Sequence, residues 1–262
     1  MTPTVRPAFL PAFARLCAVG LLGLLGLYPT LRALLEDAAR GTGPLPPLPA
    51  PLSPSLLAAL SLIQPGVLLL GAVALGVALA PGVGLRSVLA GLSARPLTRG
   101  DWAAGPLTGV LTGVGLVALD ALTRPLLGAA GATLSLSRPR SVLETVSGVL
   151  YGGITEELLL RWGVMTFLAW LGWRVLRGGR GTPGAAVMWG AVGVSALLFG
   201  AGHLGAVALS AALTPAVVAR TVLLNALVGV AFGWLYWRRN LETAMLAHGS
   251  WHVTVTLISW VA

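Results

Sequence analysis

Long apolar runs separated by short polar segments dominate the pattern along the chain. Most runs reach the ~20 apolar residues that an α-helix needs to cross the hydrocarbon core of a bilayer. The pattern therefore predicts an all-α integral membrane protein, a bundle of about seven transmembrane helices. The predicted spans cover roughly residues 8–28, 56–80, 102–122, 142–173, 185–213, 215–237 and 241 to the C-terminus.

The segments between and within these spans raise further predictions. The proline-rich stretch 41–54 predicts an extended loop, because proline does not fit a helix interior. The apolar segment 125–136 is too short to cross and predicts a re-entrant or interfacial piece; an eighth crossing in this region is the alternative. The run 185–213 exceeds one crossing, so either it tilts or its first part lies in the interface. Asp120 and Arg124 are four apart and are candidates for an ion pair.

Composition strengthens the membrane prediction. Of the 262 residues, 56% are hydrophobic and only 10% charged, with a mean hydropathy of +0.88, whereas soluble domains carry about 25% charged residues. No hydrophilic block is long enough for a separate soluble domain. We therefore expect one membrane domain, with N-terminal helices and a proline-rich loop over residues 1–139 and the helices that carry the candidate chemistry over residues 140–262.

The net charge of +9 comes from arginine alone, because the chain has no lysine. These arginines lie mainly in short loops between apolar runs, which is the pattern of the positive-inside rule and not of a nucleic-acid-binding surface. We therefore expect no nucleic-acid partner. A cytoplasmic N-terminus places nine loop arginines on the cytoplasmic side and five on the other, so we predict that orientation. The nine are Arg6, Arg86, Arg95, Arg99, Arg174, Arg177, Arg180, Arg238 and Arg239, and the five are Arg32, Arg40, Arg124, Arg138 and Arg140.

The first candidate for chemistry is the sequence EELLLR at residues 156–161, inside an apolar run. Ionisable groups in a bilayer cost about 2.5 kcal/mol or more each, so they are functional candidates by default. Glu157 and Arg161 share a helix face, which predicts a structural ion pair. Glu156 is turned about 100° away from Glu157. Because the ion pair leaves Glu156 unexplained, Glu156 is the candidate catalytic carboxylate.

All three histidines lie in apolar runs of the same half of the chain. FGAGH ends at His203, and HGSWH places His248 and His252 four apart on one helix face. Two imidazoles at this spacing can hold one metal or one substrate group. For a single histidine such as His203, the alternative is a hydrogen bond to a backbone carbonyl in a packed bundle.

Together these residues predict hydrolytic chemistry if the spans that carry them pack side by side. A buried glutamate can take a proton from water, and imidazoles can ligate a metal or hydrogen-bond an oxyanion. Asn225, which lies within the span 215–237, is interpreted as an interhelical hydrogen bond that supports the site.

The ordered motifs EExxxR, FxxxH and HxxxN/D on late transmembrane helices resemble the CPBP intramembrane metalloprotease family. That family includes type II CAAX prenyl endopeptidases and bacterial proteins of the Abi (bacteriocin self-immunity) type. The resemblance covers roughly residues 140–257. It implies a bacterial member of the family, located in the inner membrane.

The resemblance also implies a role for each motif residue. Glu156 corresponds to the family's glutamate that activates water, and Glu157 and Arg161 complete that motif. His203 corresponds to the histidine of the second motif. His248 corresponds to the first residue of the third motif.

His252 departs from the family, which usually has Asn or Asp at this position and is thought to use it to stabilise the oxyanion. A histidine can still donate a hydrogen bond there. It can equally become a third metal ligand beside His203 and His248, so a zinc site is an open alternative.

The predicted function is an intramembrane endopeptidase that hydrolyses a peptide bond with a glutamate-activated water and histidine-assisted oxyanion or metal binding. Its partners are the lipid bilayer and a peptide or membrane-protein substrate. One alternative is a proton-coupled transporter, because buried Glu, Arg and His residues also mark ion pathways. Another is a non-catalytic immunity or scaffold protein of the same fold.

Overall fold

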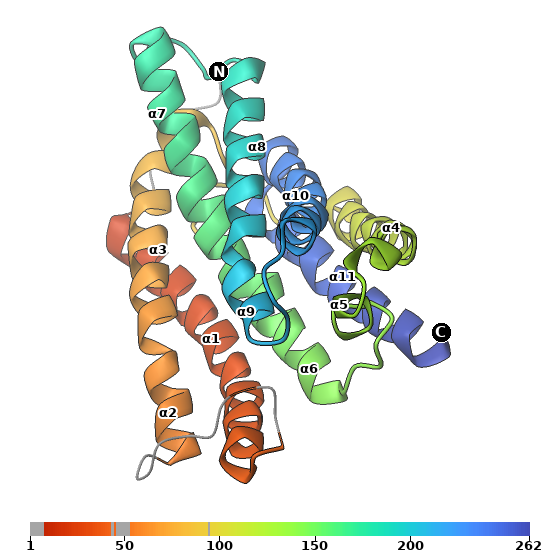
Figure 1. The fold of residues 1–262 in the computed structure, drawn as a ribbon. Coiled ribbons are helices and arrows are strands. Elements are labelled where there is room, and N and C mark those ends of the chain that lie inside the picture. The colour runs from red at the N-terminus through yellow and green to blue at the C-terminus, as the bar shows by residue number, and fades with distance from the viewer. Residues whose placement is uncertain (1–7, 43–44, 46–52, 94) are drawn as a thin grey trace.

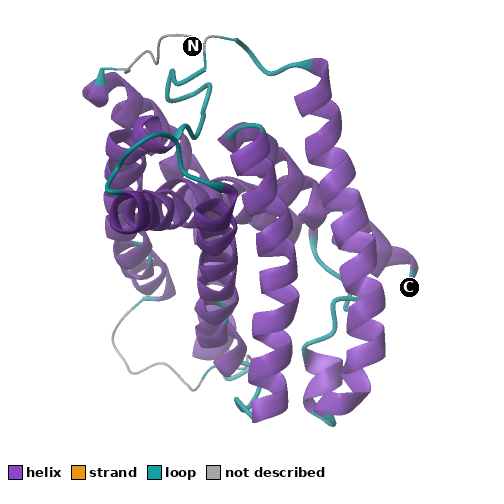
Figure 2. Ribbon diagram, turned by 90° about the horizontal axis from the view of Figure 1, so that it is seen from above, coloured by secondary structure: helices purple, strands orange, loops and turns teal. Residues whose placement is uncertain are grey.

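A computed structural model describes residues 8–42, 45, 53–93 and 95–262, and all regular elements in these ranges are helices (Figures 1 and 2). The predicted all-α architecture is confirmed. The longer helices are α1 (Phe9–Arg40), α3 (Ile63–Val83), α4 (Arg99–Thr123), α7 (Thr166–Arg177), α8 (Ala185–Gly202), α10 (Pro215–Arg238) and α11 (Leu241–Val261). The shorter ones are α2 (Pro54–Ser61), η1 (Arg124–Leu127), α5 (Ala130–Thr133), α6 (Val142–Ser147), η2 (Gly148–Glu156), η3 (Leu158–Met165) and α9 (Leu204–Ala208).

Within the described ranges, five helical segments are long and apolar enough to cross a membrane. These are Phe9–Arg40, Pro54–Val83, Arg99–Leu127, Ala185–Ala208 and Pro215–Arg238. The predicted spans 142–173 and 241 to the C-terminus are also helical but are not among these five. A total of seven or eight crossings therefore stays a prediction.

Three details of the predicted elements need correction. The first helix continues beyond residue 28 to Arg40, where ion pairs one turn apart, such as Arg32 with Glu36 at 2.7 Å, support its polar end. The run 185–213 is not one helix, because α8 ends just before His203 and the short α9 follows. Asp120 pairs with Arg220 of α10, not with the predicted Arg124.

The segment 125–136 contains only η1 and α5, which fits the predicted non-crossing piece. Two sequence predictions lie outside the described residues: the contribution of Arg6 to the orientation, and the conformation of most of the proline-rich stretch 41–54.

Side-chain caps fix where several helices begin. Thr98 and Asp101 form a reciprocal capping box at the start of α4, and Ser141 and Glu144 form another at the start of α6. The Asn240 side chain accepts a hydrogen bond from the Thr243 amide at 2.8 Å, which starts α11. These caps pin the ends of the helices that surround the candidate site.

Glycines on α4 allow α11 to pack closely against it. A Cβ atom added at Gly105 would lie 2.7 Å from Leu246 Cβ, and one added at Gly113 would lie 3.0 Å from Thr254 Cγ2. Gly109, between them, faces the Ala247 carbonyl in the same way. This small-residue stripe is typical of helix pairs in membranes, where close backbone approach supplies the packing energy.

The helices α6, η2, η3 and α7 form one continuous rod through the molecule, from Val142 to Arg177 (Figure 1). Residues 148–156 and 158–165 within it are π-helical, with wider turns than an α-helix. The rod contacts α1, α3, α8, α10 and α11. Its π-helical centre therefore lies among the helices that carry the three histidines.

Candidate active site

The two glutamates lie at the junction of the two π-helical segments. Wide π-type turns are rare and frequently occur at functional sites. The Glu157 side chain is fully buried, whereas the Glu156 side chain retains 18% exposure. A Cβ atom added at Gly153 would lie 3.2 Å from Gly249 Cα, so glycines on both helices bring α11 close to the rod. The neighbouring acids thus have different environments, one enclosed and one accessible.

His248 of α11 lies between both acids. Its Nδ1 atom is 2.8 Å from Glu157 Oε1, and its Nε2 atom is 3.8 Å from Glu156 Oε2. A carboxylate can only accept, so the Nδ1–H donates to ionised Glu157. This bond fixes the ring, and Nε2 then faces Glu156. Sequence spacing alone had assigned Glu157 to Arg161 only and missed this second contact.

The predicted ion pair between Glu157 and Arg161 is present, with 3.0 Å between Oε1 and the Arg161 Nη1. Both side chains are buried. Arg161 Nη2 also donates to the Gly229 carbonyl at 3.3 Å, and the guanidinium lies 4.7 Å from the centre of the Phe199 ring. A buried charge is costly unless it is paired and hydrogen-bonded. The charges of Glu157 and Arg161 therefore compensate each other in the interior, and Glu157 also orients the His248 ring.

His203 lies where α8 ends. Its Nδ1 atom is 2.8 Å from the Phe199 carbonyl oxygen. A carbonyl only accepts, so Nδ1 carries the hydrogen, and Nε2 of the neutral ring is an acceptor. The Phe199 ring packs edge-on against both His203 and His248. The backbone hydrogen bond considered as the structural alternative is therefore present, and it leaves the other ring nitrogen available.

His252 stacks on His248, with 5.1 Å between ring centres and an interplanar angle of 11°. The ring fills the space beside two glycines of the rod, because a Cβ atom at Gly148 or Gly152 would overlap it. Its Nδ1 atom is buried and has no hydrogen-bond partner among the described residues. An imidazole held in this way can supply a polar atom to a bound group.

These side chains line one cavity of about 390 Å³ between the helices, a size that suits a small ligand or part of a peptide. Its lining includes Glu156, His203, His248, His252 and Asn225. The interhelical hydrogen bond predicted for Asn225 is not formed by its amide NH₂. This group donates instead to the Thr221 carbonyl of its own helix at 2.8 Å. The structure thus brings together around one cavity the four residues predicted to carry the chemistry.

The zinc alternative does not fit this arrangement. Within the described ranges, no three His, Cys, Asp or Glu side chains are placed to hold one metal ion. His248 and His252 stack face to face, whereas metal ligands direct their ring nitrogens toward a common point. We therefore derive no step through a metal.

Several polar residues of the cavity were not identified from the sequence: Arg140, Glu144, Tyr151, Arg220 and Trp251. Arg140 and Glu144 precede or begin a helix, so they resembled ordinary loop charges. Burial lowers the pKa of Arg140, and the nearby charge of Arg138 lowers it further against the opposing effect of Glu144. An arginine nevertheless remains protonated in proteins. The Ser141–Glu144 capping spacing was the one available signal in this region.

The fold and the cavity define an integral membrane protein with polar, ionisable groups enclosed by its helices. Residues 138–254 match the family model described as "Type II CAAX prenyl endopeptidase Rce1-like". This part of the chain is therefore an Rce1-like type II CAAX prenyl endopeptidase domain, and the family resemblance predicted from the motifs is confirmed. The match of these residues to this family implies protease activity. No curated protein and no solved structure matches the chain. The division into residues 1–139 and 140–262 stays a prediction.

Proposed function

We propose that this chain is an intramembrane endopeptidase in which Glu156 activates a water molecule for attack on a peptide bond. The observation that carries the proposal is the convergence of one accessible carboxylate and three imidazoles on a single cavity. Glu156 is the accessible acid of the pair, and Glu157 is occupied by Arg161 and His248. The site therefore separates one acid for chemistry from one for support.

In the proposed reaction, Glu156 takes a proton from water while the water oxygen bonds to the carbonyl carbon of the substrate. His203 assists, because its Nε2 atom can accept a hydrogen bond from the same water. Glu156 then returns the proton to the leaving nitrogen as the carbon–nitrogen bond breaks. The products are a carboxylic acid, which keeps the second proton of the water, and an amine, so atoms and protons balance.

His248 and His252 are proposed to stabilise the oxyanion that forms on the carbonyl oxygen. A preorganised donor in such a position contributes about 3–4 kcal/mol to lowering the barrier. His248 donates from Nε2 when that atom also carries a proton, since Nδ1 is held by Glu157. His252 occupies the position where the family usually has Asn or Asp, and its stacking on His248 directs both rings to the same cavity.

The test uses the full chain reconstituted in liposomes and a pool of apolar peptides whose fragments are identified by mass spectrometry. We expect Glu156→Gln to lower the cleavage rate by about 100-fold or more, the typical contribution of a general base. Glu36→Gln is the matched control, because Glu36 is an exposed acid of α1 paired with Arg32. We expect that control to cleave like the unmodified chain.

If the Glu156→Gln variant retains its helical circular dichroism and cleaves at the rate of the control, Glu156 is not the base and the proposal is wrong. Loss of an ion flux in the same vesicles, without any peptide cleavage by the unmodified chain, would favour the transporter alternative instead.

A further inference from the structure

The cavity contains a cation that the proposed hydrolysis does not use. Two arginines line it, Arg140 and Arg220. Arg220 is neutralised by an ion pair with the buried Asp120 and also donates to the Leu134 carbonyl at 3.2 Å. Arg140 has no corresponding acid. Among the described residues, no carboxylate lies within ion-pair distance of its guanidinium.

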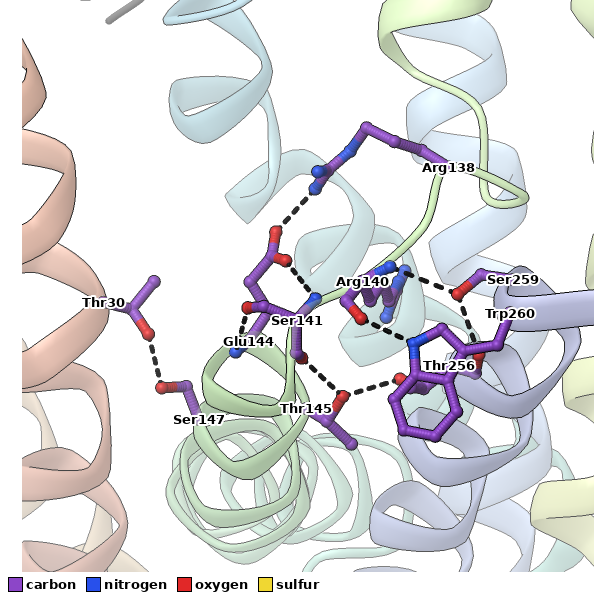
Figure 3. A network of polar contacts seen from close by, with 10 residues as sticks. All are labelled: Thr30, Arg138, Arg140, Ser141, Glu144, Thr145, Ser147, Thr256, Ser259 and Trp260. Atoms are coloured by element: carbon purple, nitrogen blue, oxygen red, sulfur yellow. Dashed lines mark hydrogen bonds and ion pairs between the residues drawn. The ribbon is translucent and has the colours of Figure 1, made fainter.

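The nearest candidate partner, Glu144, is already occupied. Arg138 Nη2 donates to Glu144 Oε1 at 2.6 Å, and the Ser141 amide donates to the other carboxylate oxygen at 2.7 Å (Figure 3). Arg138 and Arg140 thus both lie near the Glu144 carboxylate, and this carboxylate already pairs with Arg138 and caps α6. The guanidinium of Arg140 therefore has no carboxylate paired with it on its part of the cavity wall.

The backbone of Arg140 is held firmly at this place. Its amide donates to Ser259 Oγ at 3.3 Å, and its carbonyl accepts from Trp260 Nε1 at 2.8 Å, so both bonds tie it to the end of α11 (Figure 3). The guanidinium lies 5.6 Å from the centre of the Trp251 ring. A fixed backbone and an aromatic support hold a guanidinium in place, and less conformational entropy is then lost when it binds a ligand.

Two other donors of residues that line the cavity also lack partners. The Trp251 Nε1 and Arg220 Nε atoms are buried and have no hydrogen-bond partner among the described residues, and both residues line the cavity. Trp251 packs against His252, with 4.9 Å between ring centres, and His252 stacks on His248. Unpaired donors near a guanidinium without a carboxylate partner favour an acceptor-rich anion, and a carboxylate matches the planar fork of arginine.

We propose that Arg140 binds a carboxylate of the peptide substrate and so selects substrates that carry one near the scissile bond. The inference rests on the proposed peptidase function and adds a specificity-determining residue to it. The contact series from Arg140 through Trp251 and His252 to His248 places this subsite on the same wall as the proposed oxyanion donors. The carboxylate comes either from the C-terminus of the peptide or from an Asp or Glu side chain.

The test compares three short fluorescent peptides of alanine, leucine and glycine. The first has a free C-terminal carboxylate, the second is its C-terminal amide, and the third is the amide with one glutamate added. Binding is measured by fluorescence anisotropy to the detergent-purified Glu156→Gln variant, which separates recognition from cleavage. KM and kcat are then measured with the unmodified chain.

We expect the first or the third peptide to bind about 10- to 100-fold more tightly than the amide, as one charge-assisted hydrogen-bonded contact supplies. A preference for the first identifies the C-terminus as the source, and a preference for the third identifies a side chain. Adding Arg140→Gln should bring the ratio close to one and raise KM more than it lowers kcat. Arg140→Lys, which keeps the charge without the fork, should retain part of the ratio.

Arg177→Gln is the matched control, because Arg177 ends α7 and is not part of the cavity lining. Equal binding of all three peptides, or an unchanged ratio in both Arg140 variants, would overturn the inference. Carboxylate-dependent binding without any cleavage by the unmodified chain would instead contradict the proposed function and leave the anion site standing.

Discussion

At the scale of single residues, the chain pairs its buried charges across helices more than along them. The local pair Glu157–Arg161 forms, but the same Glu157 oxygen also accepts from His248, ninety-one positions away. Asp120 does not pair with Arg124, one turn along the chain, but with Arg220, one hundred positions away. Arg124 donates instead to Ser135 at 2.8 Å. In a low-dielectric interior, each buried charge is stabilised by whichever opposite charge the packing brings close.

The Glu157–Arg161 pair leads to a stability prediction. Glu157→Gln leaves the Arg161 guanidinium buried without its counter-charge, which we expect to lower the free energy of unfolding by about 3–5 kcal/mol. The double variant Glu157→Gln with Arg161→Met should lose less than the sum of the single variants, because no unpaired charge remains. Chemical unfolding of the protein in detergent measures both effects.

An exposed pair provides the comparison. Arg32 and Glu36 form an ion pair at 2.7 Å on α1, with side chains 52% and 34% exposed. Glu36→Gln should therefore change the free energy of unfolding by less than about 1 kcal/mol. A similar loss for Glu36→Gln and Glu157→Gln would show that burial is not the reason for the effect.

At the scale of elements, glycine determines which helices can meet. On α4, Gly105, Gly109 and Gly113 recur every four residues and face α11, the helix that carries His248 and His252. On the rod, Gly148 and Gly152 provide the space that the His252 ring fills. Because membrane helices gain little from apolar burial between themselves, such close contacts hold the site helices in position.

Two alanine substitutions in α4 test this. Gly109→Ala places a methyl group against the Ala247 carbonyl of α11, so we expect separation of the helices, lower thermal stability and lower activity. Gly115→Ala lies in the same helix, where an added Cβ meets no atom within 4 Å. We expect it to be neutral or to stabilise the protein by up to about 1 kcal/mol, since alanine is the better helix former. Thermal unfolding in detergent distinguishes them, and equal effects would contradict the packing argument.

At the scale of the whole molecule, the arginine distribution predicts how the bundle lies in the membrane. The loop between α7 and α8 lies at one end of the bundle, and the end of α1 lies toward the opposite end (Figure 1). The α7–α8 loop contains Arg180 and follows Arg174 and Arg177 at the end of α7. Near the end of α1, by contrast, Arg40 and Asp37 neutralise each other. The positive-inside rule assigns the α7–α8 loop to the cytoplasm.

Cysteine labelling checks this orientation. Cys17 is the only cysteine of the chain and is buried, so Cys17→Ala provides a clean background. We expect Thr42→Cys to react with a membrane-impermeant maleimide in intact cells, and Thr182→Cys to react only after the membrane is opened. The reverse pattern would invert the predicted topology, and labelling of both sites in intact cells would contradict a single orientation.

The sequence by itself determined the class of the protein and its candidate chemistry. Apolar runs of bilayer length require helices, because no other open structure satisfies the backbone in lipid. Ionisable residues inside such runs are costly, so Glu156, Glu157, Arg161 and the three histidines stood out without any structure. The order of their motifs was enough to indicate the family that residues 138–254 match.

Only the tertiary structure decided which of these residues face each other. The partner of Asp120, the contact of Glu157 with His248 and the unpaired charge of Arg140 all depend on how distant helices pack. The π-helical turns around Glu156 also have no clear signature in hydrophobic periodicity. The physical reason is that periodicity and spacing report only neighbours along one helix, whereas a cavity between helices is shaped by contacts far apart in the chain.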